Sequence, residues 1–136
     1  MRILVLCTGN SCRSQMAHGY LQRFGGDALE VFSAGIETHG VHRLAIAVMK
    51  EDGIDIGHHT SNNVDEYRHI PFDHVITVCD NALEVCPFFP AQVQQHHRNF
   101  PDPAKATGTE AEIMDAFRHT RDEIKSYCQQ FVSQRA

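Results

Sequence analysis

The feature that most constrains the fold is an apolar run, residues 3–6, that ends directly on Cys7 and is followed by a short polar loop. A short continuous aliphatic run predicts a buried strand. Gly9 lets the loop backbone turn inward without a side chain in the way. Arg13 and Ser14 then open a segment with helical spacing, so backbone N–H groups, a helix N-terminus and a guanidinium surround the thiol. This pattern favours a thiolate nucleophile in a cradle for a tetrahedral oxyanion. A buried cysteine beside a surface arginine is the simpler alternative.

Strands and helices alternate along the rest of the chain. Helical spacing of apolar residues predicts helices, and short apolar runs between turn residues predict strands. We expect strands at 1–6, 29–34, 75–78 and 94–100, helices at 14–24, 41–51 and 110–133, and room for a short helix within 60–67. Thr109 and Glu112 form a capping box at the start of the last helix. The alternation predicts a four-stranded parallel sheet in a three-layer α/β/α domain over residues 1–136.

Composition and charge narrow the classes of partner. The chain has 136 residues, which fits one domain, and its net charge of −5 argues against general binding to nucleic acid or anionic membranes. No apolar run is long enough to span a membrane and no secretory signal is recognisable, so we expect a cytoplasmic protein. The five cysteines, an odd number, are expected to be reactive thiols rather than a disulfide framework.

Two cysteines and one aspartate add to the chemistry of the first loop. Cys79 follows the run 75–78, so it shares with Cys7 the sheet edge at which parallel α/β folds bind ligands. If residues 80–85 are helical, Cys79 and Cys86 lie about two turns, or roughly 10 Å, apart. A disulfide needs Cα atoms within about 7 Å, so a bond between them requires the segment to unwind. Asp102 stands between two prolines and could be a rigidly held general acid or a plain turn residue.

These residues resemble a known family. The loop 7–14 and the Asp102-Pro103 pair together resemble the low-molecular-weight protein tyrosine phosphatase fold. The Cys79/Cys86 pair and the run 102–108 are similar to those of the thioredoxin-coupled arsenate reductases of that fold. The resemblance spans essentially the whole chain, including segments 33–35 and 49–56.

The resemblance implies reduction of arsenate to arsenite, in the service of arsenic detoxification. Cys7 would attack arsenate held by Arg13 and the loop, while Asp102 protonates the leaving oxygen. Cys79 would then attack the Cys7–arsenic adduct, releasing arsenite and leaving a Cys7–Cys79 disulfide. Cys86 would move this disulfide to Cys79–Cys86, which thioredoxin reduces. The oxyanion-binding residues implied are Thr8, Gly9, Asn10, Ser11, Cys12, Arg13 and Ser14. Phosphate or sulfate are the expected analogues of arsenate, no cofactor is expected to be bound, and we expect a monomer.

Two other functions stay open. A phosphatase acting on phosphotyrosine or small phosphate esters would use only the loop cysteine, its arginine and the aspartate. Phosphatases of this fold usually carry aromatic residues after the aspartate-proline pair, where this chain has Ala104 and Lys105. A non-enzymatic thiol switch would instead use the later cysteine pair to reshape a partner-binding loop.

We expect no metal site. Some members of the resembled family bind potassium through an Asn, an acidic residue on the first helix, a Ser before Ala-Gly and a later Asp. Asn10 and Ser33 are present, but His18 and Asn62 stand at the acidic positions, so a hard cation would lose its best ligands. A protonated His18 could replace the charge of the cation. The histidine pairs 58–59 and 96–97 are adjacent, and adjacent residues on a regular helix or strand point away from each other. Cys12 and Cys128 are expected to pack in the loop and in the core.

Overall fold

The computed structural model describes residues 1–84, 89–90 and 92–135. Within these residues, four parallel strands form one sheet in the order β2-β1-β3-β4. The strands are β1 (Arg2–Cys7), β2 (Glu30–Gly35), β3 (His74–Thr77) and β4 (Gln94–His97). Because β1 and β3 are neighbours, the loops that follow them open side by side at the carboxyl edge of the sheet.

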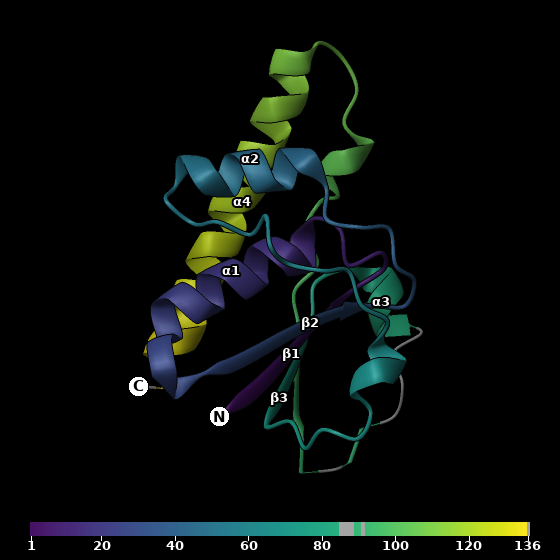
Figure 1. Cartoon of the computed structure of the whole chain (residues 1–136), viewed down its shortest axis with the longest axis vertical. Coiled ribbons are helices and arrows are strands. Elements are labelled where there is room, and N and C mark those ends of the chain that lie inside the picture. Colours follow the sequence, from purple (N-terminus) through teal and green to yellow (C-terminus); the bar gives the residue numbers. More distant parts are fainter. Residues whose placement is uncertain (85–88, 91, 136) are drawn as a thin grey trace.

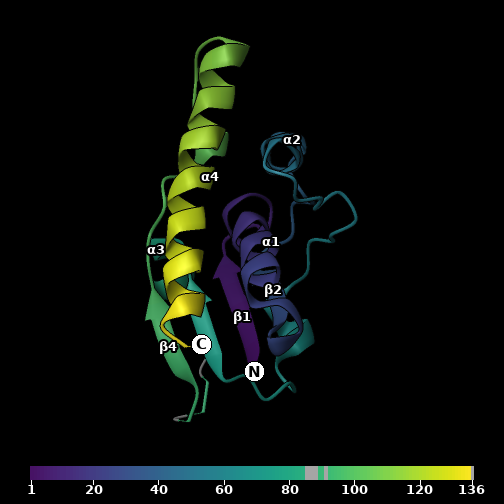
Figure 2. The same cartoon turned by 90° about the vertical axis from the view of Figure 1, so that its left-hand side faces the viewer.

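Helices cover both faces of the sheet. Helix α1 (Arg13–Gly25) packs against α4 (Glu110–Ser133) on one face, and α2 (Arg43–Glu51) lies against both (Figures 1 and 2). The short α3 (Asp80–Glu84) lies on the opposite side and contacts β1 and β3. The 3₁₀ segment η2 (Val64–Tyr67) shares that side, since the Tyr67 ring packs edge-on against Phe32 of β2. The expected three-layer architecture is confirmed.

The core forms because β1 is apolar on both faces. Residues 3–6 are fully buried, as a central strand between two helical layers requires. Fully burying one such aliphatic side chain stabilises the fold by about 1.5–3 kcal/mol. The α4 stripe of Phe117, Ile124, Cys128 and Phe131 closes one face. No helix in the described part of the chain is both long and apolar enough to cross a bilayer.

The expected elements are present, with small shifts at their ends. The capping box is confirmed: Thr109 Oγ1 accepts from Glu112 N at 3.2 Å, and Glu112 Oε1 accepts from Thr109 N at 3.2 Å. The fourth strand is shorter than the expected 94–100 and ends at His97. The chain then turns inward, and Phe100 is fully buried with its N–H donating to Val78 O. Ile113 is only partly buried, because the first turns of α4 project beyond the rest of the molecule (Figures 1 and 2).

Candidate active site

The loop after β1 closes around the sulfur of Cys7. Cys7 is 3% exposed, and its Sγ lies 2.8 Å from Ser14 Oγ and accepts from Asn10 N at 3.2 Å. Ser14 Oγ accepts from Asn10 Nδ2 at 2.7 Å, so the serine hydrogen is free to donate to the sulfur. Two donors thus converge on Cys7, which stabilises a thiolate there.

Asn10 holds the loop in shape. Its φ of 48° lies in the left-handed region, which Asn tolerates better than most residues. Its side chain is fully buried and accepts from Asn62 N at 2.8 Å through Oδ1. Its carbonyl accepts from Gln15 Nε2 at 3.1 Å. The Asn10 amide therefore braces the loop, and its partner Asn62 comes from a segment that is distant in the sequence.

The loop also sits close to the end of β2. A Cβ on Gly35 would lie 2.8 Å from both Asn10 N and Thr8 O, and 2.3 Å from Glu37 O. Only glycine fits this approach without a backbone shift. The glycine of the Ser33-Ala34-Gly35 segment is therefore required for steric reasons.

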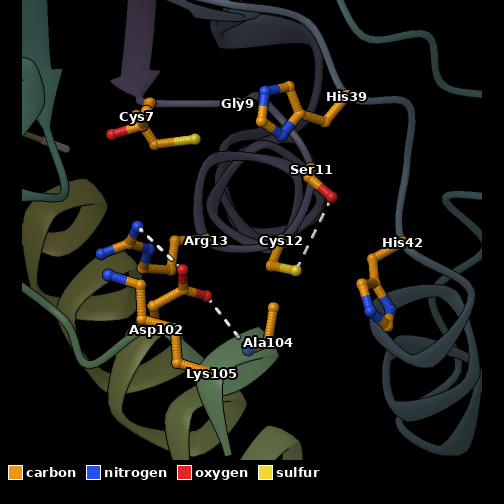
Figure 3. Close-up of a pocket in the computed structure, with 11 residues that line it drawn as sticks. Cys7, Gly9, Ser11, Cys12, Arg13, His39, His42, Asp102, Ala104 and Lys105 are labelled. Carbon is orange, nitrogen blue, oxygen red and sulfur yellow. Dashed lines mark hydrogen bonds and ion pairs between the residues drawn. The ribbon is translucent and has the colours of Figure 1, made fainter.

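Arg13 and Asp102 line, together with Cys7, a pocket of about 420 Å³ (Figure 3). Arg13 Nη1 donates to Phe100 O at 3.0 Å, and its Nη2 lies 3.6 Å from Asp102 Oδ2. Asp102 Oδ1 accepts from Ala104 N at 3.0 Å and so begins the 3₁₀ turn Pro103–Lys105. The sequence left two roles open for Asp102, a turn residue or a general acid, and the geometry is compatible with both. One of its carboxylate oxygens caps the turn, while the other faces Arg13.

The pocket walls include residues that the sequence did not single out. His39 and His42 line one side, opposite Ala104 and Lys105 (Figure 3). The His39 ring stands over Gly9, where a Cβ would lie 3.1 Å from its Cγ. His42 N-caps α2 by accepting from Leu44 N at 3.1 Å. The only sequence signal for them is that residues 36–42 follow the carboxyl end of a parallel strand.

Cys79 contacts Thr8 of the loop that follows β1. Cys79 is 3% exposed at the start of α3, and its Sγ lies 3.4 Å from Thr8 Oγ1 and accepts from Ala82 N at 3.4 Å. Asn81 Nδ2 donates to Thr8 Oγ1 at 3.0 Å. Cys79 is thereby brought beside the residue that follows Cys7. Cys86 lies outside the described residues.

The other cysteines are inert by burial. Desolvation raises the pKa of Cys12 to about 12 and raises that of Cys128 strongly. Cys12 lines the pocket with its sulfur 3.8 Å from Ser11 Oγ, and Cys128 is fully buried under α1. All four described cysteines, Cys7, Cys12, Cys79 and Cys128, are free thiols.

His18 is neutral, which corrects the idea that it supplies a positive charge. Burial, with a smaller contribution from His59 and His58, lowers its pKa to about 3. Its Nδ1 lies 2.8 Å from Ser33 Oγ, and its ring lies against His59 with centroids 4.4 Å apart. His59 Nδ1 lies 3.0 Å from Gln15 Oε1; since Gln15 Nε2 donates to two carbonyls, the His59 nitrogen carries the proton.

A hard cation does not fit this cluster. Asn62 Oδ1 accepts from Thr60 Oγ1 at 2.7 Å, and Asn10 Oδ1 accepts from Asn62 N, so the amide oxygens already have partners. The two positions themselves carry a neutral histidine, His18, and an amide, Asn62, whose Nδ2 donates to Glu66 Oε1 at 3.2 Å, so neither supplies a charged ligand. In the described part of the chain, no three His, Cys, Asp or Glu side chains are grouped as a metal ion would require.

Known proteins similar to this chain fall in one family. The family model for low molecular weight phosphotyrosine protein phosphatase matches residues 2–135. This chain belongs to that family. Within it, the chain is 50% identical over 122 residues to a protein named arsenate reductase from Halalkalibacterium halodurans, covering 90% of this chain and 88% of the relative. The resemblance to arsenate reductases of the phosphatase fold is therefore confirmed.

Solved structures of this family extend the likeness to three dimensions. An arsenate reductase in the oxidized state superposes with a TM-score of 0.86 at 28% identity, covering 99% of this chain and 98% of the other. An arsenate reductase in the phosphate-binding state gives a TM-score of 0.80 at 29% identity, covering 98% and 97%. This family member thus shares its fold with enzymes that have been observed in more than one redox and ligand state.

Proposed function

We propose that this chain reduces arsenate to arsenite, with Cys7 as the nucleophile. The observation that carries the proposal is the convergence of Ser14 Oγ and Asn10 N on the Cys7 sulfur at the floor of a pocket that also contains Arg13. A thiolate, a planar guanidinium and inward backbone donors suit a tetrahedral oxyanion. The relatives named arsenate reductase support arsenate as that anion, with phosphate or sulfate as analogues.

In the first step, the Cys7 thiolate attacks arsenic and an As–O bond breaks. Arg13 and the loop residues Thr8 to Ser14 hold the remaining oxygens. Asp102 supplies the proton, so the leaving oxygen departs as water. Support comes from the shared pocket of Cys7, Arg13 and Asp102 and from the 3.6 Å approach of the guanidinium to the carboxylate.

In the second step, Cys79 attacks the sulfur of the Cys7–arsenic adduct. An S–S bond forms, the S–As bond breaks, and its electron pair stays on arsenic, which leaves as arsenite. The contact of Cys79 Sγ with Thr8 Oγ1 at 3.4 Å, one residue from Cys7, supports this order. Arsenic gains the two electrons that the two thiols lose.

In the third step, Cys86 attacks Cys79 and releases Cys7 as a thiolate, leaving a Cys79–Cys86 disulfide. Thioredoxin then reduces this bond through its own dithiol. The step requires α3 to unwind, because six residues lie between the two cysteines and a helix over them would hold the sulfurs too far apart for a disulfide. A five-residue helix is marginal by itself, so the cost of unwinding is small.

We further propose that the enzyme works as a cytoplasmic monomer without bound cofactor or potassium. The proposed absence of potassium is supported by hydrogen bonds between neutral groups around His18, Ser33 and Asn10, which brace the anion loop without a cation.

The deciding experiment is arsenate-dependent NADPH consumption with thioredoxin and thioredoxin reductase. Wild type should turn over, whereas Cys79→Ser should release no arsenite. Cys86→Ser should release one arsenite per chain and then stop. Cys128→Ala, which changes a buried cysteine outside the route, is the control and should keep wild-type turnover. A phosphatase would hydrolyse phosphoesters regardless of Cys79 and Cys86, and a thiol switch would show no turnover. Wild type that consumes no NADPH with arsenate, whether or not it hydrolyses phosphoesters, would overturn the proposal.

A further inference from the structure

Ser61 reaches the anion loop from a distant part of the chain. Its Oγ donates to Gly9 O at 3.0 Å, and His39 N donates to the same carbonyl oxygen at 3.0 Å. Two donors from separate segments therefore hold this carbonyl on the outer side of the loop. The serine is half-buried and is not among the residues that line the pocket around Cys7, so its contact with the loop runs through the backbone.

The carbonyl of Gly9 and the amide of Asn10 belong to one peptide unit. Because a trans peptide is planar, its C=O and N–H point in opposite directions. With the carbonyl held outward, the Asn10 N–H points inward and donates to Cys7 Sγ at 3.2 Å. The bond from Ser61 on one side of the peptide therefore fixes the donor that reaches the sulfur on the other side.

This peptide needs to be held, because its reversal would relieve the backbone at Asn10. Reversing the Gly9–Asn10 peptide changes ψ of Gly9 and φ of Asn10. Glycine accepts a wide range of ψ. Asn10 has a φ of 48°, so reversal would move it from the left-handed region to the negative range that most residues adopt. Donors on the outer carbonyl oppose that reversal.

The backbone that carries Ser61 is itself anchored on both sides. On one side, Thr60 O accepts from Gln15 Nε2 at 2.9 Å. On the other side, Asn62 N donates to Asn10 Oδ1 at 2.8 Å. The hydroxyl is therefore presented to the loop from a fixed position.

We propose that Ser61 is a positioning residue of the anion loop, an inference that rests on the proposed function. Its hydroxyl holds the Gly9–Asn10 peptide so that the Asn10 amide stays directed at the Cys7 thiolate and at the oxyanion bound beside it. The serine acts through this peptide and touches neither the sulfur nor the anion. Donors that are already in place stabilise developing negative charge without reorganisation, so the hydroxyl contributes to the rate from outside the pocket.

The test measures how the alkylation of Cys7 by iodoacetamide depends on pH, since only the thiolate reacts. Mass spectrometry of the tryptic peptide 3–13, followed by fragmentation, separates Cys7 from Cys12. Ser61→Ala should raise the pH at which the rate is half-maximal by about 0.5–1 unit, because the thiolate loses part of its hydrogen bond from the Asn10 amide.

Two variants serve as controls. Ser61→Thr keeps the hydroxyl and should keep the wild-type midpoint. Thr60→Val removes the neighbouring hydroxyl, which donates to Asn62 Oδ1 rather than to the loop, and should also keep it. All three variants retain the titratable groups that line the pocket with Cys7, namely Cys12, Arg13, His39, His42, Asp102 and Lys105.

Arsenate turnover gives the second readout. With thioredoxin in excess, kcat/KM for arsenate should fall about fivefold in Ser61→Ala, the effect of one hydrogen bond, and stay at the wild-type value in the two controls. An unshifted alkylation midpoint in Ser61→Ala would overturn the positioning role. The same midpoint shift in Ser61→Thr or in Thr60→Val would overturn it too, since the effect would not then depend on this hydroxyl.

The failure of the proposed function looks different. In that case wild type itself would consume no NADPH with arsenate. Alkylation requires no arsenate, so the pH profiles of the four proteins still decide whether Ser61 holds the loop amide on Cys7.

Discussion

The anion loop and α3 lie side by side but are built in opposite ways. Asn10, Ser14 and Gln15 of the loop and the start of α1 are fully buried, and each makes hydrogen bonds to distant or neighbouring residues. Helix α3 has five residues, most of them exposed, and few side-chain contacts beyond Asn81 to Thr8 and Asp80 to His97. Donors for a tetrahedral anion act best when they are already in place. In the proposed route Cys79 has to move, and a segment of low local stability suits that movement. On this proposal the anion loop serves recognition and α3 serves movement.

The largest effect is expected where the anion itself is held. Arg13→Lys keeps the charge but loses the planar fork that binds two oxygens and the contact to Phe100 O. We expect kcat/KM for arsenate to fall by about 10²–10³, with little change in the thermal midpoint. Steady-state kinetics and thermal unfolding measure the two quantities. A fall of less than fivefold would mean that the loop N–H groups bind the anion without Arg13.

Asn10→Ala should destabilise the anion loop and with it the whole fold. It removes the bonds to Ser14 Oγ and Asn62 N and leaves alanine at a φ of 48°. We expect the free energy of unfolding to fall by about 2–3 kcal/mol and arsenate turnover to fall with it. Urea unfolding measures the change. An unchanged midpoint would show that the loop is not held by this residue.

Because His18 is neutral in the folded protein, the free energy of unfolding should fall in acid. Burial lowers its pKa from 6.5 to about 3, so between these values the unfolded chain binds a proton that the folded chain does not. Its contribution to stability is therefore complete above pH 6.5 and is lost as the pH falls toward 3. From pH 7 to pH 5 the loss is about 2 kcal/mol. His18→Gln should lose correspondingly less over this range, measured by urea unfolding at both values. Parallel losses in both proteins would contradict a neutral His18.

Asn81→Ala is the matched substitution in α3. It removes one exposed hydrogen bond, Asn81 Nδ2 to Thr8 Oγ1, and leaves no buried group unpaired. We expect the free energy of unfolding to change by less than about 1 kcal/mol and KM for arsenate to stay the same. The contrast with Asn10→Ala, made with the same pair of residue types, is the direct test. Comparable destabilisation would break the division between the two regions.

The smallest effect is expected from potassium. Replacing sodium with potassium at constant ionic strength should leave both turnover and the thermal midpoint unchanged, because the neutral His18 and the amide of Asn62 stand where charged ligands would bind the ion. Thermal unfolding and arsenate turnover in the two salts provide the measurements. A clear rise in either with potassium alone would show that the neutral cluster around His18 still binds the cation.

Local signals made much of this molecule predictable. The run 3–6 with Cys7, the helix that follows, and the Thr109–Glu112 capping box depend on neighbours in the chain, and the structure contains each of them. The sequence prediction made β4 too long, because residues 94–99 are all polar and their pattern does not show where the strand ends. In the structure the strand ends at His97, and the chain then turns inward to bury Phe100. Burial is a property of the fold and has no local signature.

The sequence by itself determined the chemistry available: a thiol at a strand end, an anion loop, an arginine, an aspartate between prolines and a later cysteine pair. The tertiary structure decided which of these groups meet. The order β2-β1-β3-β4 brings Cys79 to Thr8, the loop at Asn62 reaches Asn10, and the pocket gains His39 and His42. The charge of His18 was also decided there, because desolvation depends on what packs around a ring rather than on which residue carries it.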